Sequence, residues 1–210
     1  TKNASIRTLG LLRVYGADHP IPGARSLQAG QRVVELVSHL NADDLLICLL
    51  SGGASALMTA PVDGISLADL QALTAVMLKS GASIDELNAL RRRLDRLKGG
   101  GLAQLAAPAR VLSLILSDVV GDRLEVIASG PTVPDPTTNA DIEAILSRYS
   151  LAETLPSSIL NPLRFVEQDA ILLQPDHVQN ILVGSNSLSV QAAQKQAERA
   201  GFRVRVLTTS

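Results

Sequence analysis

The sequence predicts an α/β fold of the Rossmann-like type, with a mostly parallel sheet and helices on both faces. Two observations predict it. Three apolar runs, at 45–50, 111–116 and 181–183, each end abruptly in a small, polar, turn-prone cluster. Runs that are apolar at nearly every position are typical of strands buried on both faces inside a parallel sheet. Segments with helical periodicity separate the runs, and strands that alternate with helices form parallel sheets.

The first part of the chain is predicted to form a strand, a helix and a second strand. A strand is expected at 9–15, and Ser26 can cap a helix over 27–40, where apolar residues recur at helical spacing. A polar turn at 41–44 then leads into the strand at 45–50. This unit is the building block of a parallel sheet.

Two capping boxes mark the helices that follow. Ser66 with Asp69, and Ser83 with Glu86, have the spacing at which side chains and backbone N–H groups satisfy each other at a helix start. Three glycines after residue 98 end the second of these helices. The expected helices are 67–79, 84–97 and a short one at 102–106.

The second half of the chain contains a stiff loop and another strand–helix–strand unit. Three prolines and a glycine at 128–138 exclude a helix or a central strand there. The remaining expected elements are a helix at 139–149, a strand at 181–183, a helix at 187–200 and a strand at 203–207.

Composition excludes several classes of partner. The 210 residues carry a net charge of −1, and only 2% of them are aromatic. Without a basic field or stacking rings, neither nucleic acid nor an anionic membrane surface is expected to bind. No run approaches the ~20 apolar residues that span a bilayer. Cys48 is the single cysteine, so no internal disulfide points to export, and we expect a cytoplasmic protein.

The loops that follow the apolar runs are the expected ligand site, because open α/β sheets bind ligands beyond the carboxyl ends of their strands. In the first loop, Ser51, Gly52, Gly53 and Ser55 combine hydroxyls with glycines that let a ligand approach the backbone. The alternative is a tight turn without a ligand. The loop is neither a Walker A motif nor a dinucleotide fingerprint. The third loop contributes Asn186 as a substrate-binding candidate.

The second loop places carboxylates at a strand end. Ser117 and Asp118 follow the run 111–116, and Asp122 lies four positions after Asp118. Aspartate at such a place can hold Mg²⁺ or take a proton from a hydroxyl. The alternative is that Asp118 caps a turn and Asp122 is solvated.

A basic stretch offers a candidate anion site. Arg91 and Lys98 are seven residues apart and would share one face of the expected helix, together with Asn88. These three residues can bind phosphate or carboxylate. The alternative is a solvated face whose cations lie favourably near a helix C-terminus.

Three blocks of residues carry a resemblance to a known family. They are Leu49-Leu50-Ser51-Gly52-Gly53-Ala54-Ser55-Ala56-Leu57, then 80–91 with 97–100, and Ser117-Asp118-Val119-Val120-Gly121-Asp122 with 127–135. With these blocks, over roughly residues 15–209, the chain resembles the glycerate 2-kinase family, the ATP-dependent class that older naming calls hydroxypyruvate reductase. It departs from the family's frequent Arg-Lys-His-Leu-Ser at Arg91-Arg92-Arg93-Leu94-Asp95.

The resemblance implies a fold, a reaction and a set of site residues. The family has two α/β domains with the active site between them, and it transfers the γ-phosphoryl of ATP to the 2-hydroxyl of D-glycerate with Mg²⁺. By resemblance, the loop at 51–55 lines the cleft, Arg91 and Lys98 bind anionic groups, and Asp118 and Asp122 serve the metal or the hydroxyl.

The resemblance also bears on the extent of the protein. We expect residues 1–210 to be most of the larger, N-terminal domain, without the family's N-terminal start and C-terminal domain, and inactive alone. A homo-oligomer is a further expectation. Two alternatives stay open: an NAD(P)H-dependent hydroxypyruvate reductase, and a ligand-binding fragment without catalysis.

Overall fold

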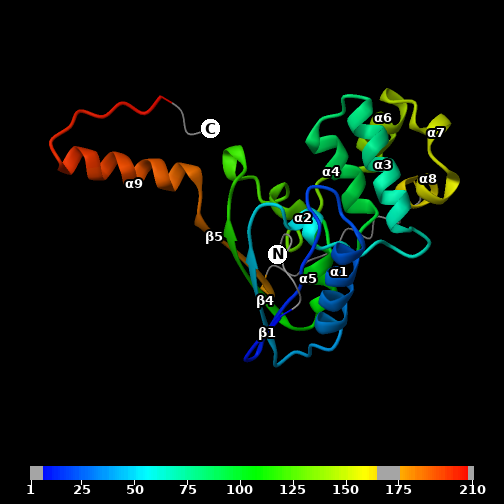
Figure 1. The fold of residues 1–210 in the computed structure, drawn as a ribbon, viewed down its shortest axis with the longest axis horizontal. Coiled ribbons are helices and arrows are strands. Elements are labelled where there is room, and N and C mark those ends of the chain that lie inside the picture. Colours follow the sequence, from blue (N-terminus) through cyan, green and yellow to red (C-terminus); the bar gives the residue numbers. More distant parts are fainter. Residues whose placement is uncertain (1–6, 165–175, 208–210) are drawn as a thin grey trace.

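Three parallel strands form the sheet on which the structure is built. The computed structural model describes residues 7–164 and 176–207. Strands β3 (Leu45–Leu50), β4 (Arg110–Leu116) and β5 (Val178–Gly184) lie in the order β3-β4-β5, and all pairs are parallel (Figure 1). The predicted parallel α/β fold is therefore confirmed. Because the strands run the same way, their carboxyl ends meet at one edge of the sheet.

Two helices cover one face of this sheet. Helices α1 (Ala24–Val37) and α5 (Gly101–Ala106) share an apolar cluster with alternate residues of β3 and β4, among them Cys48 and Val111. The opposite face exposes the intervening residues of β3, and Leu49 is 77% exposed. Helices on both faces were expected, but among the described residues α1 and α5 pack on the same face, so apolar side chains of the other face meet solvent.

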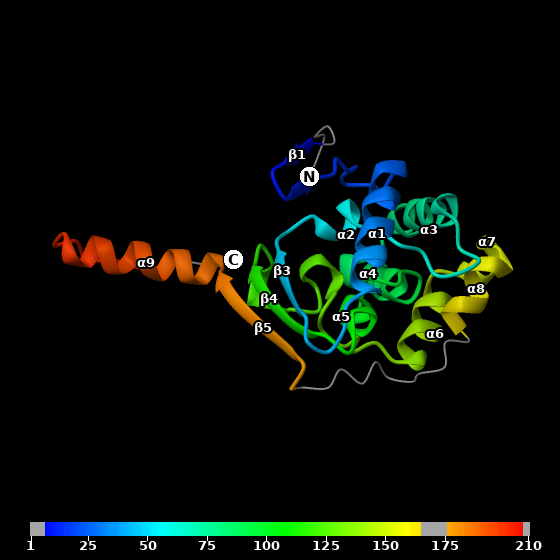
Figure 2. The same ribbon diagram turned by 90° about the horizontal axis from the view of Figure 1, so that it is seen from below.

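A second apolar core lies beside the sheet, within a group of helices (Figure 2). Leu73, Met77, Leu90 and Leu163 are fully buried in it. Its helices are α3 (Leu67–Lys79), α4 (Ile84–Arg93), α6 (Asn139–Arg148), α7 (Leu151–Thr154) and α8 (Ser157–Arg164).

Local capping signals were predicted correctly for α3 and α4. Ser66 accepts from Asp69 N and Ser83 accepts from Glu86 N, each as part of a full capping box. The start of α1 differs from the prediction because the helix begins after Gly23. Ser26 lies inside its first turn, fully buried, and accepts a hydrogen bond from Asp18 N at 3.0 Å.

Helix α4 ends earlier than its residue pattern predicts. It stops at Arg93 rather than near residue 97, because the chain then pairs with another segment. Val62 N donates to Leu94 O at 3.0 Å and Arg96 N donates to Ala60 O at 2.8 Å. These bonds replace the helical ones and carry residues 94–100 through a series of turns.

Both ends of the described chain differ from the prediction. The expected strand at 9–15 is a small antiparallel hairpin of β1 (Arg7–Leu9) and β2 (Leu12–Val14). The expected strand at 203–207 is irregular, because no neighbouring strand pairs with it among the described residues. Helix α9 (Asn186–Arg199), which precedes it, has no buried residue and extends away from the body (Figures 1 and 2).

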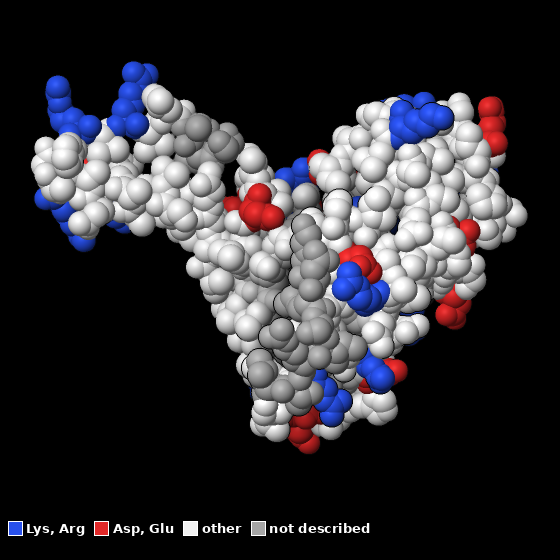
Figure 3. All heavy atoms as spheres, in the orientation of Figure 1, with Lys and Arg blue, Asp and Glu red and all other residues white. Residues whose placement is uncertain are grey.

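Figure 3 shows how the charged side chains are distributed over one face of the molecule. Basic and acidic side chains are interspersed over the body, whereas the arm that contains α9 shows mainly basic ones. Among residues 7–164 and 176–207, no helix is long and apolar enough to cross a membrane.

The short elements between the strands and helices are α2 (Ala54–Leu57), η1 (Val120–Asp122) and η2 (Ile127–Ser129).

Candidate active site at the carboxyl ends of the strands

The loops that follow the three parallel strands lie together, as the sequence predicts. Ser117 N, just after β4, donates to Gly184 O at the end of β5 at 2.8 Å. Gly52, just after β3, is in direct contact with Asp118, because a Cβ added at Gly52 would overlap the Asp118 carboxylate. The first and second loops therefore meet where the Asp118 side chain contacts the backbone of Gly52. The second and third loops meet through the backbone hydrogen bond from Ser117 N to Gly184 O.

The two glycines of the first loop are favoured for different reasons, Gly53 by its left-handed φ and Gly52 by the close approach of Asp118. Gly53 has a φ of +81°, and a Cβ there would stand 3.2 Å from the His19 ring. Gly52 has no Cβ, and the Asp118 carboxylate occupies the space that a Cβ would fill. Sequence reasoning gave His19 no role. It enters the site because a distant loop packs on Gly53, and no local signal predicts that contact.

The aspartates of the second loop have different surroundings. Ser117 is 7% exposed, and its hydroxyl donates to Val119 O and accepts from Val119 N, both at 3.2 Å, so it shapes the turn. Asp118 is exposed and Asp122 half-buried. Asp122 has a φ of +53°, an uncommon conformation for a residue other than glycine. In the described part of the chain, no group of three His, Cys, Asp or Glu side chains could hold a metal ion.

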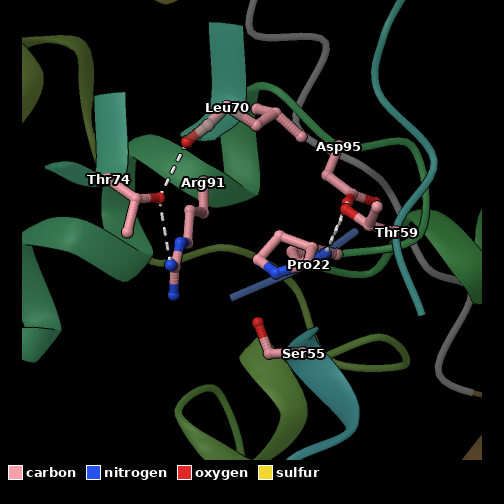
Figure 4. A pocket seen from close by; sticks show the side chains of 8 residues that line it. Pro22, Ser55, Thr59, Leu70, Thr74, Arg91 and Asp95 are labelled. Atoms are coloured by element: carbon pink, nitrogen blue, oxygen red, sulfur yellow. Dashed lines mark hydrogen bonds and ion pairs between the residues drawn. The ribbon is translucent and has the colours of Figure 1, made fainter. Parts of the chain in front are cut away.

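A pocket lies beside the first loop, between α2 and the end of α4. Figure 4 shows the Ser55 hydroxyl and the Arg91 guanidinium directed into the same space. The volume of the pocket is about 10 Å³, which is room for about one water molecule. The pocket can therefore take one small polar group of a ligand but not a whole nucleotide. Its lining residues are Pro22, Ser55, Thr59, Leu70, Thr74, Arg91, Asp95 and Lys98.

The structure brings Arg91 and Lys98 together, but not along a helix. Arg91 lies in the last turn of α4, whereas Lys98 follows the helix and reaches the pocket through the turns at 94–100. Asn88 is 6% exposed within α4 and is not among the pocket's lining residues. The expected helical stripe of Asn88, Arg91 and Lys98 therefore does not form, although two of its members share the pocket.

Lys98 is buried and fully engaged by its neighbours. Its ammonium donates to Asp95 Oδ2, to Met58 O at 3.3 Å and to Thr59 Oγ1 at 3.4 Å. Asp95 also accepts from Thr59 Oγ1 at 2.5 Å and from Ala60 N at 3.2 Å. Burial lowers the pKa of Lys98, and the Asp95 carboxylate opposes that shift.

Arg91 is held differently. Its Nη2 donates to Thr74 Oγ1 at 3.1 Å, and Thr74 in turn donates to Leu70 O at 2.7 Å. Burial lowers the pKa of Arg91, with Asp95 opposing. A guanidinium stays protonated nonetheless, so Arg91 is a permanent cation with donors left for a ligand.

Ser129 is a site residue that sequence reasoning missed. Its hydroxyl is 2.8 Å from that of Ser55, and its backbone carbonyl accepts from Gly99 N at 2.9 Å. Ser129 is fully buried and has a φ of +63°, and Ala128 before it has a φ of +55°. Backbone in this region is strained for such residues and often accompanies functional sites. The prolines at 128–138 predict a stiff loop but not this contact.

Asn186 is placed at the edge of the site. It is the first residue of α9 and exposed, while Ser185 before it caps the helix by accepting from Leu188 N at 3.2 Å. The loop that carries it touches the second loop through Gly184.

Comparison with known proteins places the chain in a family. Residues 1–164 match the family described as "Domain of unknown function (DUF4147)". The chain belongs to the DUF4147 family. Strands β3 and β4 and the loops that follow them lie within the matched residues, whereas β5 and its loop lie beyond residue 164.

Relatives of this DUF4147 chain include enzymes of known name. It is 47% identical over 196 residues to the glycerate kinase of Rattus norvegicus, covering 93% of this chain and 38% of that protein. It is 41% identical over 200 residues to the D-glycerate 2-kinase of Thermotoga maritima, covering 94% of this chain and 46% of that one. The chain thus spans less than half the length of these relatives.

A solved structure agrees with the fold. The crystal structure of a glycerate kinase from Thermotoga maritima superposes with a TM-score of 0.87 at 37% identity. The match covers 98% of this chain and 48% of the crystallised one. The fold described above is therefore similar to about half of that protein.

Proposed function

We propose that the protein is a glycerate kinase that transfers the γ-phosphoryl group of ATP to the 2-hydroxyl of D-glycerate and forms 2-phosphoglycerate. One observation carries the proposal. The Asp118 carboxylate lies against the glycine loop after β3, and that same loop supplies Ser55 to the pocket of Arg91. Phosphoryl transfer depends on positioning and charge neutralisation, which these groups supply. The similarity to glycerate kinases over most of the chain supports the same reaction.

Asp118 is the proposed proton acceptor and metal contact. It is exposed at the strand end, where a carboxylate can accept the hydroxyl proton of glycerate. The donor set also fits Mg²⁺, which takes one or two carboxylates and completes its shell with waters and substrate phosphates, so a cage of three protein ligands is not needed. Asp122 is the proposed second carboxylate. When bound, Mg²⁺ would neutralise charge on the phosphates.

The remaining residues are proposed to bind the two substrates. Arg91 and Ser55 offer hydrogen-bond donors in the pocket, with Lys98 in its wall. Ser51, Gly52 and Gly53 offer backbone and hydroxyl groups to phosphate oxygens at the strand end. Ser117 shapes the second loop and Asn186 borders the third. Asn88 lies one helical turn before Arg91 in α4.

The active protein is proposed to be longer than this chain. The rat relative is matched over only 38% of its length. We propose a protein with two α/β domains, of which residues 1–210 form most of one, with the cleft between the domains as its active site. Exposed apolar residues such as Leu49 make self-association of the 210 residues a further proposal. The single free cysteine suits the cytoplasm.

Two coupled assays test the function. The full-length product of the gene is given D-glycerate, ATP and Mg²⁺, with ADP release followed, and separately hydroxypyruvate with NADH or NADPH. We expect ATP-dependent turnover and no nicotinamide oxidation, and we expect residues 1–210 alone to be inactive. Reduction of hydroxypyruvate without ADP release would instead identify a reductase. Binding of ATP and glycerate without turnover by the full-length protein would identify a ligand-binding module.

A further inference from the structure

The pocket beside Ser55 is lined by three charged side chains whose charges do not act equally. They are Arg91, Lys98 and Asp95, two cations and one carboxylate. Asp95 and Lys98 form an ion pair in which the side chains are 1% and 4% exposed. Charges buried this deeply are little screened by solvent or salt. The pocket's net charge is therefore set by which of these groups compensate each other.

The pair of Asp95 and Lys98 is neutral as a unit. If both are ionised their charges cancel, and if the proton moves from the ammonium to the carboxylate neither is charged. Lys98 has three N–H donors, and these match its three acceptors on Asp95, Met58 and Thr59. The ammonium thus has no donor left for a ligand.

Arg91 remains as the uncompensated cation. Among the described residues it forms no salt bridge, and its hydrogen bond to Thr74 uses one of five guanidinium N–H groups. Figure 4 shows the guanidinium ending in the open part of the pocket that Ser55 faces. The pocket therefore presents one positive charge and a hydroxyl.

We propose that Asp95 sets the ligand class of this pocket: by pairing with Lys98 it leaves Arg91 as the single free charge, so that the pocket accepts an oxygen of a monoanionic carboxylate in preference to one of a dianionic phosphate. The inference rests on the proposed function, in which the monoanion is the carboxylate of D-glycerate. A planar guanidinium matches a carboxylate in shape as well as in charge. ATP phosphates would then lie at the strand-end loops and not in this pocket.

The test changes the pocket's charge and measures which anion it prefers. Calorimetry of the full-length protein gives the dissociation constants of D-glycerate, a monoanion, and of sulfate, a dianion at every pH used. In Asp95→Asn the ammonium of Lys98 loses its partner and adds a second positive charge. We expect the affinity for sulfate relative to D-glycerate to rise by about tenfold or more at pH 6.

The increase in relative affinity for sulfate in Asp95→Asn should depend on pH, because it depends on the charge of Lys98. Two charged side chains act on Lys98, Asp95 from its own turn and Arg91 from α4. In Asp95→Asn the burial and Arg91 both favour the neutral amine, and the opposing carboxylate is gone. The pKa of Lys98 is then lower than in the wild type, so the relative gain for sulfate should shrink as the pH rises.

A double variant and a second single variant complete the design. Asp95→Asn with Lys98→Met removes both partners, leaves no buried charge unpaired, and should return the ratio toward the wild-type value. Arg91→Gln should weaken both anions by about tenfold or more, because it removes the free cation. Circular dichroism confirms folding of each variant, and the double variant keeps the test decisive if Asp95→Asn alone does not fold.

Several results would overturn the inference. The first two concern the affinity for sulfate relative to D-glycerate: this ratio is unchanged in Asp95→Asn, or it rises there and stays raised in the double variant. The other two are the loss of anion selectivity in a folded double variant and a wild-type protein that binds neither anion. Kinase assays run in parallel separate the two proposals. An active kinase with an unchanged ratio in Asp95→Asn would refute only the pocket's charge rule. The predicted anion ratios without phosphoryl transfer would refute only the kinase.

Discussion

The Asp118 carboxylate lies directly on Gly52, and no other residue type leaves room for it there. Gly52→Ala should therefore displace the Asp118 carboxylate and lower kcat of the full-length enzyme by about 10²-fold. The cost to stability should be small, because the exposed Asp118 side chain can move aside. Backbone strain is not the cause, since Gly52 has no left-handed φ.

Gly64→Ala is the matched control for Gly52→Ala. Gly64 has a φ of +81° and faces open space, so alanine there should cost about 1–2 kcal/mol of stability through backbone strain and leave kcat unchanged. Steady-state kinetics measures kcat of both variants, and urea unfolding measures their free energies of unfolding. Equal kcat in Gly52→Ala and the wild type would show that the contact with Asp118 does not matter for turnover.

Asp118→Asn tests the proposed proton acceptor. The substitution keeps size and removes the charge, and we expect kcat to fall by about 10²-fold or more, the range of general-base catalysis. The fold should remain intact because Asp118 is exposed. Asp63→Asn, at another exposed aspartate, is the control and should retain full turnover. Unchanged kcat in Asp118→Asn would remove this residue from the mechanism.

Ser129 is expected to hold the Ser55 hydroxyl in place. Ser129→Ala removes that hydrogen bond and should destabilise the fold by about 1–2 kcal/mol while raising KM for glycerate. Ser129→Gly removes the same bond but relieves the left-handed φ of +63°, so it should be the more stable of the two variants by about 1 kcal/mol. Thermal unfolding checks the stabilities, and steady-state kinetics checks KM for glycerate. A wild-type KM in both variants would show that Ser129 does not position the Ser55 hydroxyl.

Cys48 should be a slow, high-pH nucleophile. Burial raises the pKa of its thiol to about 11, partly offset by a hydrogen bond with Ser113. The thiolate fraction at pH 8 should therefore be about 100-fold below that of a free thiol, and iodoacetamide should react correspondingly slowly until urea unfolds the chain. Cys48 is the sole cysteine, so labelling reports on this site alone.

The same shift in the pKa of Cys48 affects stability. A pKa that is higher in the folded state than in the unfolded state stabilises the fold below the unfolded value of 9.0, and this contribution is lost as the pH rises through about 11. Unfolding midpoints of the wild type and Cys48→Ser should therefore converge over that range. An alkylation rate that already levels off near pH 9 would contradict the account.

Local signals in the sequence predicted most of the fold. The runs that became β3 and β4 and the capping boxes at Ser66 and Ser83 depend on neighbours within a few residues, so single-sequence reasoning reaches them. The strand at 203–207 needed a partner strand and did not form among the described residues.

The candidate site depends on contacts that are distant in sequence. Its strand-end loops were predictable because parallel strands share one edge. Thr59 reaches Asp95 across 36 residues and Ser55 reaches Ser129 across 74. Spacing along the chain carries no information on such pairs. The same holds for Lys98, which joins Arg91 only because α4 ends at Arg93 and the chain turns back.

Phosphorus-31 NMR of the full-length protein with ATP, Mg²⁺ and D-glycerate tests the central claim most directly, because it reads where the γ-phosphoryl group goes. We expect ADP together with a phosphate monoester whose phosphorus couples to the single proton on C2 of glycerate. A monoester coupled to the two protons on C3, or inorganic phosphate as the sole product, would contradict it.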